Sequence, residues 1–240
     1  MNGGRYYDDL KHVDHNYIDY GLADLVRSSD VGERRRFRRL IVEQRKRLGK
    51  GGLCWDAAFV LGEHVAHNVD EWRNDEDGNG DVKVTRILEL GAGTGLCGLM
   101  IGTMVSNCHV ELTDLPELQD LMSANIERNT MTLSDVGSNV SCRVLRWGVD
   151  DDYVHSTYDV VLGADVVTSI YDPIALARTF HALSGPNTMV YVSGKARLDK
   201  PHEVFEAEME VLFAKVRKVE RPCSRLRSPN VFVIVANGKR

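Results

Sequence analysis

The chain has few cysteines and no long apolar run, and both shortages restrict what it can be. Five of its 240 residues are cysteine, they are scattered, and no Cys-x-x-Cys pair occurs. An odd, unclustered set predicts reduced thiols rather than a disulfide scaffold, so we expect a cytoplasmic protein. No run approaches the roughly 18 apolar residues of a membrane-spanning helix, and the first residues lack the apolar stretch of a secretory signal.

Aromatic residues are also sparse, at 7% of the chain, and no aromatic platform accompanies the basic segment 34–50. A basic run can bind RNA or an acidic protein, but without stacking aromatics a nucleic-acid partner is disfavoured. The alternative is the solvated face of a helix over residues 31–48. The apolar residues expected to face inward from this helix are Phe37, Leu40, Ile41 and Leu48.

Histidines do not form a metal-binding pattern. His64 and His67 lie three residues apart and lack the i,i+4 spacing of a zinc pair on a helix. We therefore expect both at the surface and predict no metal site.

The length and the 43% hydrophobic content suffice for one large α/β domain. Residues 1–30 are polar and aromatic without a clear period, and the glycines of 49–52 break the basic segment. We therefore expect an N-terminal arm and basic helix over 1–48, followed by a single domain over 49–240.

The most informative segment is 86–95, Arg-Ile-Leu-Glu-Leu-Gly-Ala-Gly-Thr-Gly. It predicts a strand that runs into a tight glycine turn and then opens a helix. Glycine is needed where the backbone turns with positive φ or touches a ligand closely. Amide groups at the start of a helix are free to bind a polar ligand, so this loop is expected to hold a nucleotide-like cofactor.

Two cofactor classes fit the loop. Residues 93–98 match the G-x-G-x-x-G pattern of dinucleotide sites such as those for NAD. Glu89, two residues before Gly91-Ala92-Gly93-Thr94-Gly95, fits S-adenosylmethionine better. A pyrophosphate disfavours a neighbouring carboxylate, whereas a cationic sulfonium with its ammonium group tolerates one, so the methyl donor is favoured.

Asp114 ends the next predicted strand, about 20 residues beyond the glycines, where an acid accepts hydrogen bonds from ribose hydroxyls. Both cofactor classes share this feature. The alternative is that Asp114 caps the helix opened by Pro116, and the two roles are compatible.

Strand and helix patterns then alternate to the end of the chain, as in parallel βα units. The last two strands, near 216–219 and 231–235, are expected to pair antiparallel. We therefore predict a Rossmann-like α/β fold: a seven-stranded class I methyltransferase sheet with a terminal antiparallel hairpin and an N-terminal helical extension. The predicted helices cover 53–67, 96–104, 117–128, 173–183 and 203–213, and the predicted strands cover 84–90, 110–113, 140–145, 158–165, 188–193, 216–219 and 231–235.

Several motifs together resemble the class I protein-lysine methyltransferases of the methyltransferase-like 21 group, over about residues 50–195. They are Leu53-Cys54-Trp55-Asp56-Ala57-Ala58, the glycine loop, Thr113-Asp114-Leu115-Pro116, Asn125-Ile126-Glu127-Arg128-Asn129, Arg146-Trp147-Gly148 and Tyr158 to Asp165. The resemblance implies S-adenosyl-L-methionine as cofactor and a protein substrate that presents a lysine, such as a chaperone, an AAA ATPase or a translation factor. No membrane or metal partner is implied.

The resemblance also implies residue roles. Trp55 would lie near the methionine end of the cofactor, Asp114 would bind the ribose, and Trp147 would lie beside the adenine, although large aromatics are usually core residues. Asp165 and Tyr171 would act on the acceptor. The remaining residues expected to contact the cofactor are Glu89, Gly91, Ala92, Gly93, Leu115 and Ala164.

The chain departs from the family at the acceptor side. The family's Asp-x-x-Tyr motif has Thr168 at its last position, and a tyrosine follows only at Tyr171. In segment 194–197 only Arg197 is kept. These departures leave two alternatives open: a cofactor-binding interaction protein with impaired catalysis, and a small-molecule or RNA methyltransferase. For Asp165 a further alternative is the N-cap of a helix that begins near Thr168.

Overall fold

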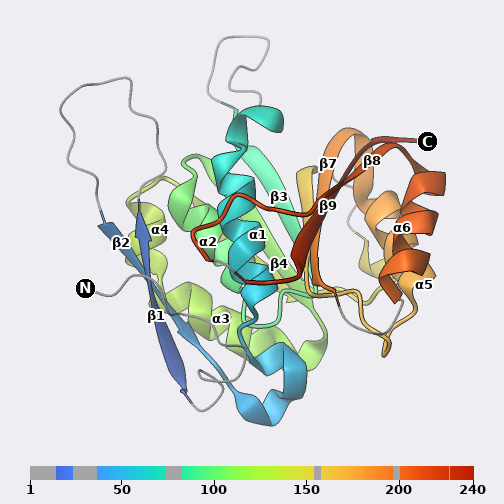
Figure 1. Ribbon diagram of the computed structural model, residues 1–240. Helices are drawn as coiled ribbons and strands as arrows, with labels where there is room; N and C mark the ends of the chain where they lie inside the picture. The colour runs from blue at the N-terminus through green and yellow to red at the C-terminus, as the bar shows by residue number, and fades with distance from the viewer. Residues whose placement is uncertain (1–14, 24–36, 74–82, 154–157, 197–200, 227) are drawn as a thin grey trace.

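The computed structural model describes residues 15–23, 37–73, 83–153, 158–196, 201–226 and 228–240. A seven-stranded sheet forms its centre, with strand order β5-β4-β3-β6-β7-β9-β8 (Figure 1). Its strands are β3 (Thr85–Leu90), β4 (Cys108–Asp114), β5 (Asn139–Val144), β6 (Tyr158–Ala164), β7 (Ser184–Lys195), β8 (Phe213–Val219) and β9 (Val231–Lys239). In this order β3 and β6 are neighbours. The chain adds β4 and β5 on one side of β3 and then crosses to the other side of β3 to add β6 and β7.

The sheet is mixed. Strands β3, β4, β5, β6 and β7 pair in parallel, whereas β9 pairs antiparallel with both β7 and β8. The predicted terminal antiparallel pair is therefore confirmed. A Rossmann-like seven-stranded sheet is the fold that the alternating pattern indicated.

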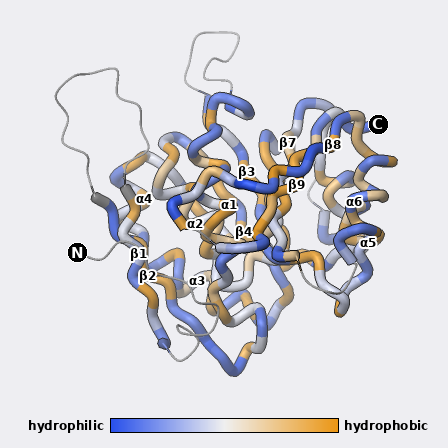
Figure 2. Tube along the Cα trace, in the orientation of Figure 1, coloured by the Kyte–Doolittle hydropathy of each residue, from blue (hydrophilic) through white to orange (hydrophobic). Residues whose placement is uncertain are grey.

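Helices cover both faces of the sheet, and two apolar clusters fill the space between the layers. One cluster joins α1 and α2 to side chains such as Val110 and Leu162, and the other joins α5 and α6 to side chains such as Val161 and Val192. Figure 2 shows the apolar colour concentrated in this central layer. The helices are α1 (Asp56–His67), α2 (Leu96–Met104), α3 (Gln119–Arg128), α4 (Thr130–Ser134), α5 (Pro173–Leu183) and α6 (Pro201–Leu212).

The helix predicted over 31–48 is wrong. Phe37–Glu43 forms strand β2, which pairs antiparallel with β1 (Tyr17–Ala23), and a 3₁₀ segment, η1 (Lys46–Gly52), follows. The two strands are drawn in blue at the side of the molecule in Figure 1. Residues 31–36 lie outside the described part of the chain.

The alternation of side chains explains why the segment forms a strand. Leu40 and Val42 are fully buried, while Arg39, which precedes Leu40 and faces the other side of the strand, is exposed and pairs with Asp19 of β1. Arg38, on the buried side, donates from Nη1 to the carbonyl of Thr103 at 2.6 Å, near the end of α2. A period of two, rather than the helical period, therefore divides the inner and outer faces.

The prediction that His64 lies at the surface is also wrong, because only 5% of it is exposed. Its Nδ1 accepts from the backbone N–H of Cys223 at 3.1 Å, and burial lowers its pKa. The same face of α1 holds the β8–β9 connection through Glu63, which accepts from Ser224, and through Asp56, which accepts from Ser228. These contacts are structural and lie outside the cavity described next.

Candidate functional site

A cavity of about 720 Å³ opens at the carboxyl ends of β3, β4 and β6, the edge of the sheet where open α/β folds bind ligands. This volume lies within the usual range for small-molecule sites, roughly 300–1,000 Å³. The residues predicted for the site all line it: Trp55, Glu89, Gly91, Ala92, Gly93, Asp114, Leu115, Trp147, Ala164, Asp165 and Tyr171. Arg197 lies outside the described residues.

The glycine loop is shaped by positive φ angles at Gly91 (+63°), Gly93 (+56°) and Gly95 (+79°). A Cβ on Gly91 would lie 2.8 Å from Val166 and 2.9 Å from the Trp147 ring. A Cβ on Gly93 would lie 2.7 Å from the carbonyl oxygen of Gly51. The loop therefore needs glycine both for its backbone angles and for the close approach of the cavity walls.

Asp114 braces this loop. Its carboxylate accepts from the backbone N–H of Gly93 and from that of Leu115, both at 2.7 Å. The short helix that Pro116 begins has no side-chain cap, so the capping role considered for Asp114 is wrong. Burial raises the pKa of Asp114, and the two N–H donors oppose that rise. A carboxylate has about four acceptor positions, so it retains capacity for a ligand hydroxyl.

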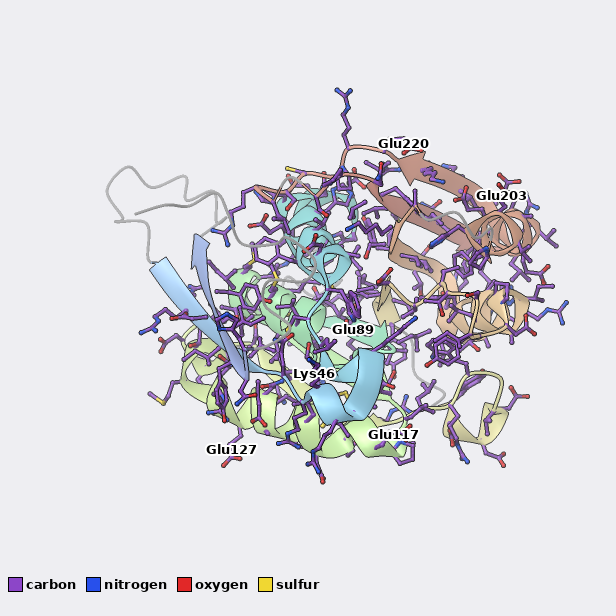
Figure 3. The ribbon with its side chains drawn as sticks, turned by 60° about the horizontal axis from the view of Figure 1, so that its bottom comes forward. Lys46, Glu89, Glu117, Glu127, Glu203 and Glu220 are labelled. Carbon is purple, nitrogen blue, oxygen red and sulfur yellow. The ribbon has the colours of Figure 1, made fainter. Side chains whose placement is uncertain are left out.

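Glu89 forms the floor of the cavity and is only 1% exposed. Figure 3 labels it near the centre of the molecule, while Glu117, another lining residue, lies nearer the edge. The Oε2 atom of Glu89 accepts from the N–H of Gly98 at 2.7 Å. Burial raises its pKa to about 8, which the Gly98 N–H opposes and the charge of Asp114 reinforces.

Aromatic rings wall the cavity. Trp55 donates from its indole N–H to the carbonyl of Lys50 at 3.0 Å, which fixes the ring just before α1. Trp147 follows β5, and Tyr171 packs against it edge to face, with ring centroids 5.1 Å apart. These flat apolar surfaces suit a flat ligand ring.

Asp165 follows β6 directly and adopts φ +53°. Its backbone N–H donates to Ser193 on β7 at 2.9 Å, so the bend is fixed by the sheet. Helix α5 begins only at Pro173, with Asp172 accepting from Ile174 as its N-cap. The alternative that Asp165 caps a helix beginning near Thr168 is therefore wrong.

Thr168 lines the cavity where the family motif has tyrosine. A turn closed by the bond from Tyr171 N–H to the Thr168 carbonyl, 3.4 Å, brings the Tyr171 ring to the rim. Ile170 and Tyr171 are 60% and 46% exposed there. The tyrosine three residues later therefore reaches the same cavity.

Sequence reasoning missed the η1 wall. Leu48, Lys50 and Gly51 line the cavity, but the glycines of 49–52 were interpreted only as a break between elements. Three glycines in the four residues 49–52 were the available signal for a close approach of two backbones, because the backbone of Gly51 packs against Gly93.

The seven-stranded sheet with its antiparallel end and its glycine loop has the class I methyltransferase fold. A TehB-like methyltransferase from Corynebacterium glutamicum shares the fold, with a TM-score of 0.52 at 18% identity over 74% of this chain and 88% of that one. The profile of the lysine methyltransferase family matches residues 35–211. The chain belongs to this lysine methyltransferase family, and its cofactor is therefore S-adenosylmethionine rather than a dinucleotide.

Two relatives illustrate the relationship. The METTL21A protein N-lysine methyltransferase of Danio rerio is 34% identical over 170 residues, which make up 70% of this chain and 71% of that protein. The EEF1A lysine methyltransferase 3 of Xenopus tropicalis is 34% identical over 152 residues, 62% of this chain and 60% of that protein. The match thus spans less than two thirds of the Xenopus protein.

Among the described residues, no helix combines the length and the apolar content that crossing a bilayer requires.

Proposed function

We propose that this chain transfers a methyl group from S-adenosylmethionine to a lysine side chain of a protein substrate. The observation that carries the proposal is one cavity that joins the glycine loop to the Asp165 carboxylate. Membership of the lysine methyltransferase family supports the same reaction.

The cavity suggests how its residues bind the cofactor. Asp114 binds the ribose hydroxyls with the acceptor positions that the loop leaves available, and Leu115 packs beside it. The backbone of Gly91, Ala92 and Gly93 contacts the ligand at close range. Trp147 packs against the adenine, and the floor and walls are completed by Glu89, Ala164 and Trp55.

The cofactor supplies an electrophilic methyl group on a sulfonium. The protein would hold the lysine nitrogen in line with that methyl, so that the carbon–nitrogen bond could form as the carbon–sulfur bond breaks and a neutral thioether leaves; positioning of this kind contributes roughly 7–11 kcal/mol. Asp165 attracts and orients the incoming ammonium, whose proton leaves to water because the neighbouring positive charge lowers the pKa of the amine. Tyr171 gives the lysine an aromatic wall that favours a cation.

The partner is a protein, and we propose a translation factor as its class. One relative is named for EEF1A as its substrate, which supports this class of acceptor. We further propose a cytoplasmic location, since the five cysteines are free thiols, as a reducing compartment would keep them.

Two measurements test the proposal. Calorimetry with S-adenosylmethionine and with NAD should detect binding of the methyl donor, and binding of NAD alone would contradict it. Incubation with radiolabelled donor and a cell extract should then label a protein band, resistant to ribonuclease, with the label on lysine. Asp165→Asn is the control for turnover. Donor binding without any label indicates an interaction protein with impaired catalysis, an alternative that Thr168 in the acceptor motif motivates.

A further inference from the structure

We infer that Asn125 is a positioning residue of the cofactor site, because its carboxamide fastens the glycine loop to the N-terminal hairpin of β1 and β2. The inference rests on the proposed function, since it concerns how the donor pocket is held in shape. Asn125 lies on α3 and is completely buried.

The Asn125 side chain makes three hydrogen bonds to backbone groups. Its Oδ1 accepts from the N–H of Glu43 at 2.7 Å, and its Nδ2 donates to the carbonyl of Glu43 at 3.1 Å. The second hydrogen on Nδ2 serves the carbonyl of Thr94 at 2.9 Å. One amide thus binds a strand residue on one side and the glycine loop on the other.

Asn129 repeats the first half of this arrangement one turn later. Its Oδ1 accepts from the N–H of Ile41 at 2.9 Å, and its Nδ2 donates to the carbonyl of Ile41 at 2.8 Å. Its remaining donor goes to the backbone oxygen of Asn125 at 2.7 Å. Together the two side chains pair with the edge of β2 as a neighbouring strand would, because Ile41 and Glu43 present their backbone groups on the same side.

Thr94 is the residue through which the hairpin acts on the pocket. It lies between Gly93 and Gly95, both of positive φ, and it lines the cavity. Two further bonds of this turn come from the sheet and from the loop itself: Gly93 N–H donates to Asp114, and Gly95 N–H donates to the carbonyl of Ala92. The bond from Asn125 to the carbonyl of Thr94 attaches the turn to α3. Loss of this bond leaves the Thr94 carbonyl without that donor and the turn less constrained.

A second connection runs in the same direction. Gln44, directly after β2, accepts from the N–H of Cys54 at 2.7 Å and donates to the carbonyl of His15 at 2.9 Å. Cys54 in turn contacts the hydroxyl of Thr94 at 3.5 Å. The hairpin is therefore hydrogen-bonded, through Asn125, Gln44 and Cys54, to the loop that lines the cofactor site, although it lies outside the seven-stranded sheet.

Comparison of Asn125→Leu with Asn129→Leu separates positioning from general stability. The two residues are 0% and 2% exposed and each makes a two-bond pair with β2, but Asn125 alone of this pair bonds Thr94. Donor KM, kcat and the melting temperature are measured for both variants and the wild type. Asn125→Leu should raise the donor KM about tenfold or more with little change in kcat, as expected when a buried acceptor loses its partner. Asn129→Leu should lower the melting temperature similarly but leave the donor KM within about twofold.

Equal effects of the two variants on the donor KM would overturn the inference, since hairpin anchoring alone would then explain them. If Asn125→Leu does not fold, Asn125→Ser, which leaves room for a bridging water, takes its place, and an unchanged donor KM overturns the inference equally. If the wild type binds S-adenosylmethionine and Asn125→Ser behaves as the wild type does, the inference fails but the proposed function stands. A wild type that binds no donor overturns both.

Discussion

The ring of Tyr171 stands edge-on to that of Trp147, with an interplanar angle of 75° and 5.1 Å between centroids. Trp147 also approaches the position that a Cβ on Gly91 would occupy. The indole is therefore held between the glycine loop on one side and the exposed rim on the other. A change at the rim is expected to reach the cofactor through this ring.

Substitutions of Tyr171 should separate its ring from its hydroxyl. Tyr171→Phe keeps the edge-to-face pair with Trp147, so donor affinity should stay within about twofold. Tyr171→Ala removes a pair worth about 0.5–1.5 kcal/mol and should weaken donor binding by a similar free energy. Calorimetry gives the affinities. Equal affinities for all three proteins would show that the Trp147 ring does not depend on its neighbour.

Asp165→Asn tests the acceptor role. Asparagine tolerates the φ of +53° at this position, so the backbone should be unchanged. We expect kcat to fall about 100-fold, the loss that a misplaced reactant produces, while donor affinity stays within about threefold. Asp172→Asn is the matched control, because asparagine caps α5 as well as aspartate does. Wild-type turnover in Asp165→Asn would assign the acceptor site to other residues.

Gly91→Ala should abolish donor binding because the added Cβ collides with Val166 and Trp147. Gly148→Ala is its control: φ there is +76°, yet nothing lies within 4 Å of the added Cβ. Both variants suffer the left-handed strain of about 1–2 kcal/mol, seen in thermal unfolding. Only the first should lose the donor in calorimetry, and a loss in both would attribute the effect to strain.

Asp114→Ala should weaken donor binding by about 1–3 kcal/mol, the range for removing one partner of a buried hydrogen bond. The N–H of Gly93 also loses its acceptor, so a modest drop in melting temperature should accompany the effect. Asp120→Ala, an exposed acid on α3, provides the control for charge alone. Unchanged donor affinity in folded Asp114→Ala would contradict the ribose assignment.

Glu89 predicts a specific dependence of stability on pH. Burial raises its pKa from 4.5 to about 8, so its contribution to stability is fully present below pH 4.5 and is lost as pH rises to about 8. Within that window the unfolded chain ionises Glu89 while the folded chain keeps it protonated. The slope approaches about 1.4 kcal/mol per pH unit for a single proton.

Glu89→Gln lacks this proton, so its stability relative to the wild type should increase with pH. Urea unfolding of both proteins at pH 5, 6, 7 and 8 measures the difference. A difference that stays constant over this range would mean that Glu89 is ionised in the folded protein.

Local patterns predicted the elements whose geometry is decided locally. Helices α2 and α5 were predicted with their observed bounds, Leu96–Met104 and Pro173–Leu183. In α5, Asp172 before Pro173 is a local start signal. The glycine loop was recognisable because its backbone angles require glycine.

The hairpin was not recognisable because its stability comes from distant residues. The apolar residues of this segment, Leu40, Ile41 and Leu48, fit a helical spacing. The alternation of buried with less buried positions, in which Leu40 and Val42 are the buried ones, covers only one short strand and was overlooked. The groups that pair with the edge of β2 are on Asn125 and Asn129, and an asparagine that binds backbone leaves no periodic signal in the sequence.

The sequence predicted which residues lie on the acceptor side, but it did not predict the backbone turn that brings them together. Thr168 in the motif position suggested a lost aromatic, and only the turn from Thr168 to Tyr171 places the later ring in the same cavity. Similarly, the buried position of His64 depends on the β8–β9 connection that packs over α1.

The hydrogen bonds that Asn125 of α3 and Asn129, directly after α3, make to β2 join residues 82 and 88 positions apart. During synthesis at about 5–20 residues per second, the hairpin therefore waits roughly 4–18 seconds before its partner helix has been made. Throughout this interval the strand edge that Asn125 and Asn129 later occupy is open to other extended chains. The synthesis of α3 and of Asn129 after it therefore supplies the groups that close this edge.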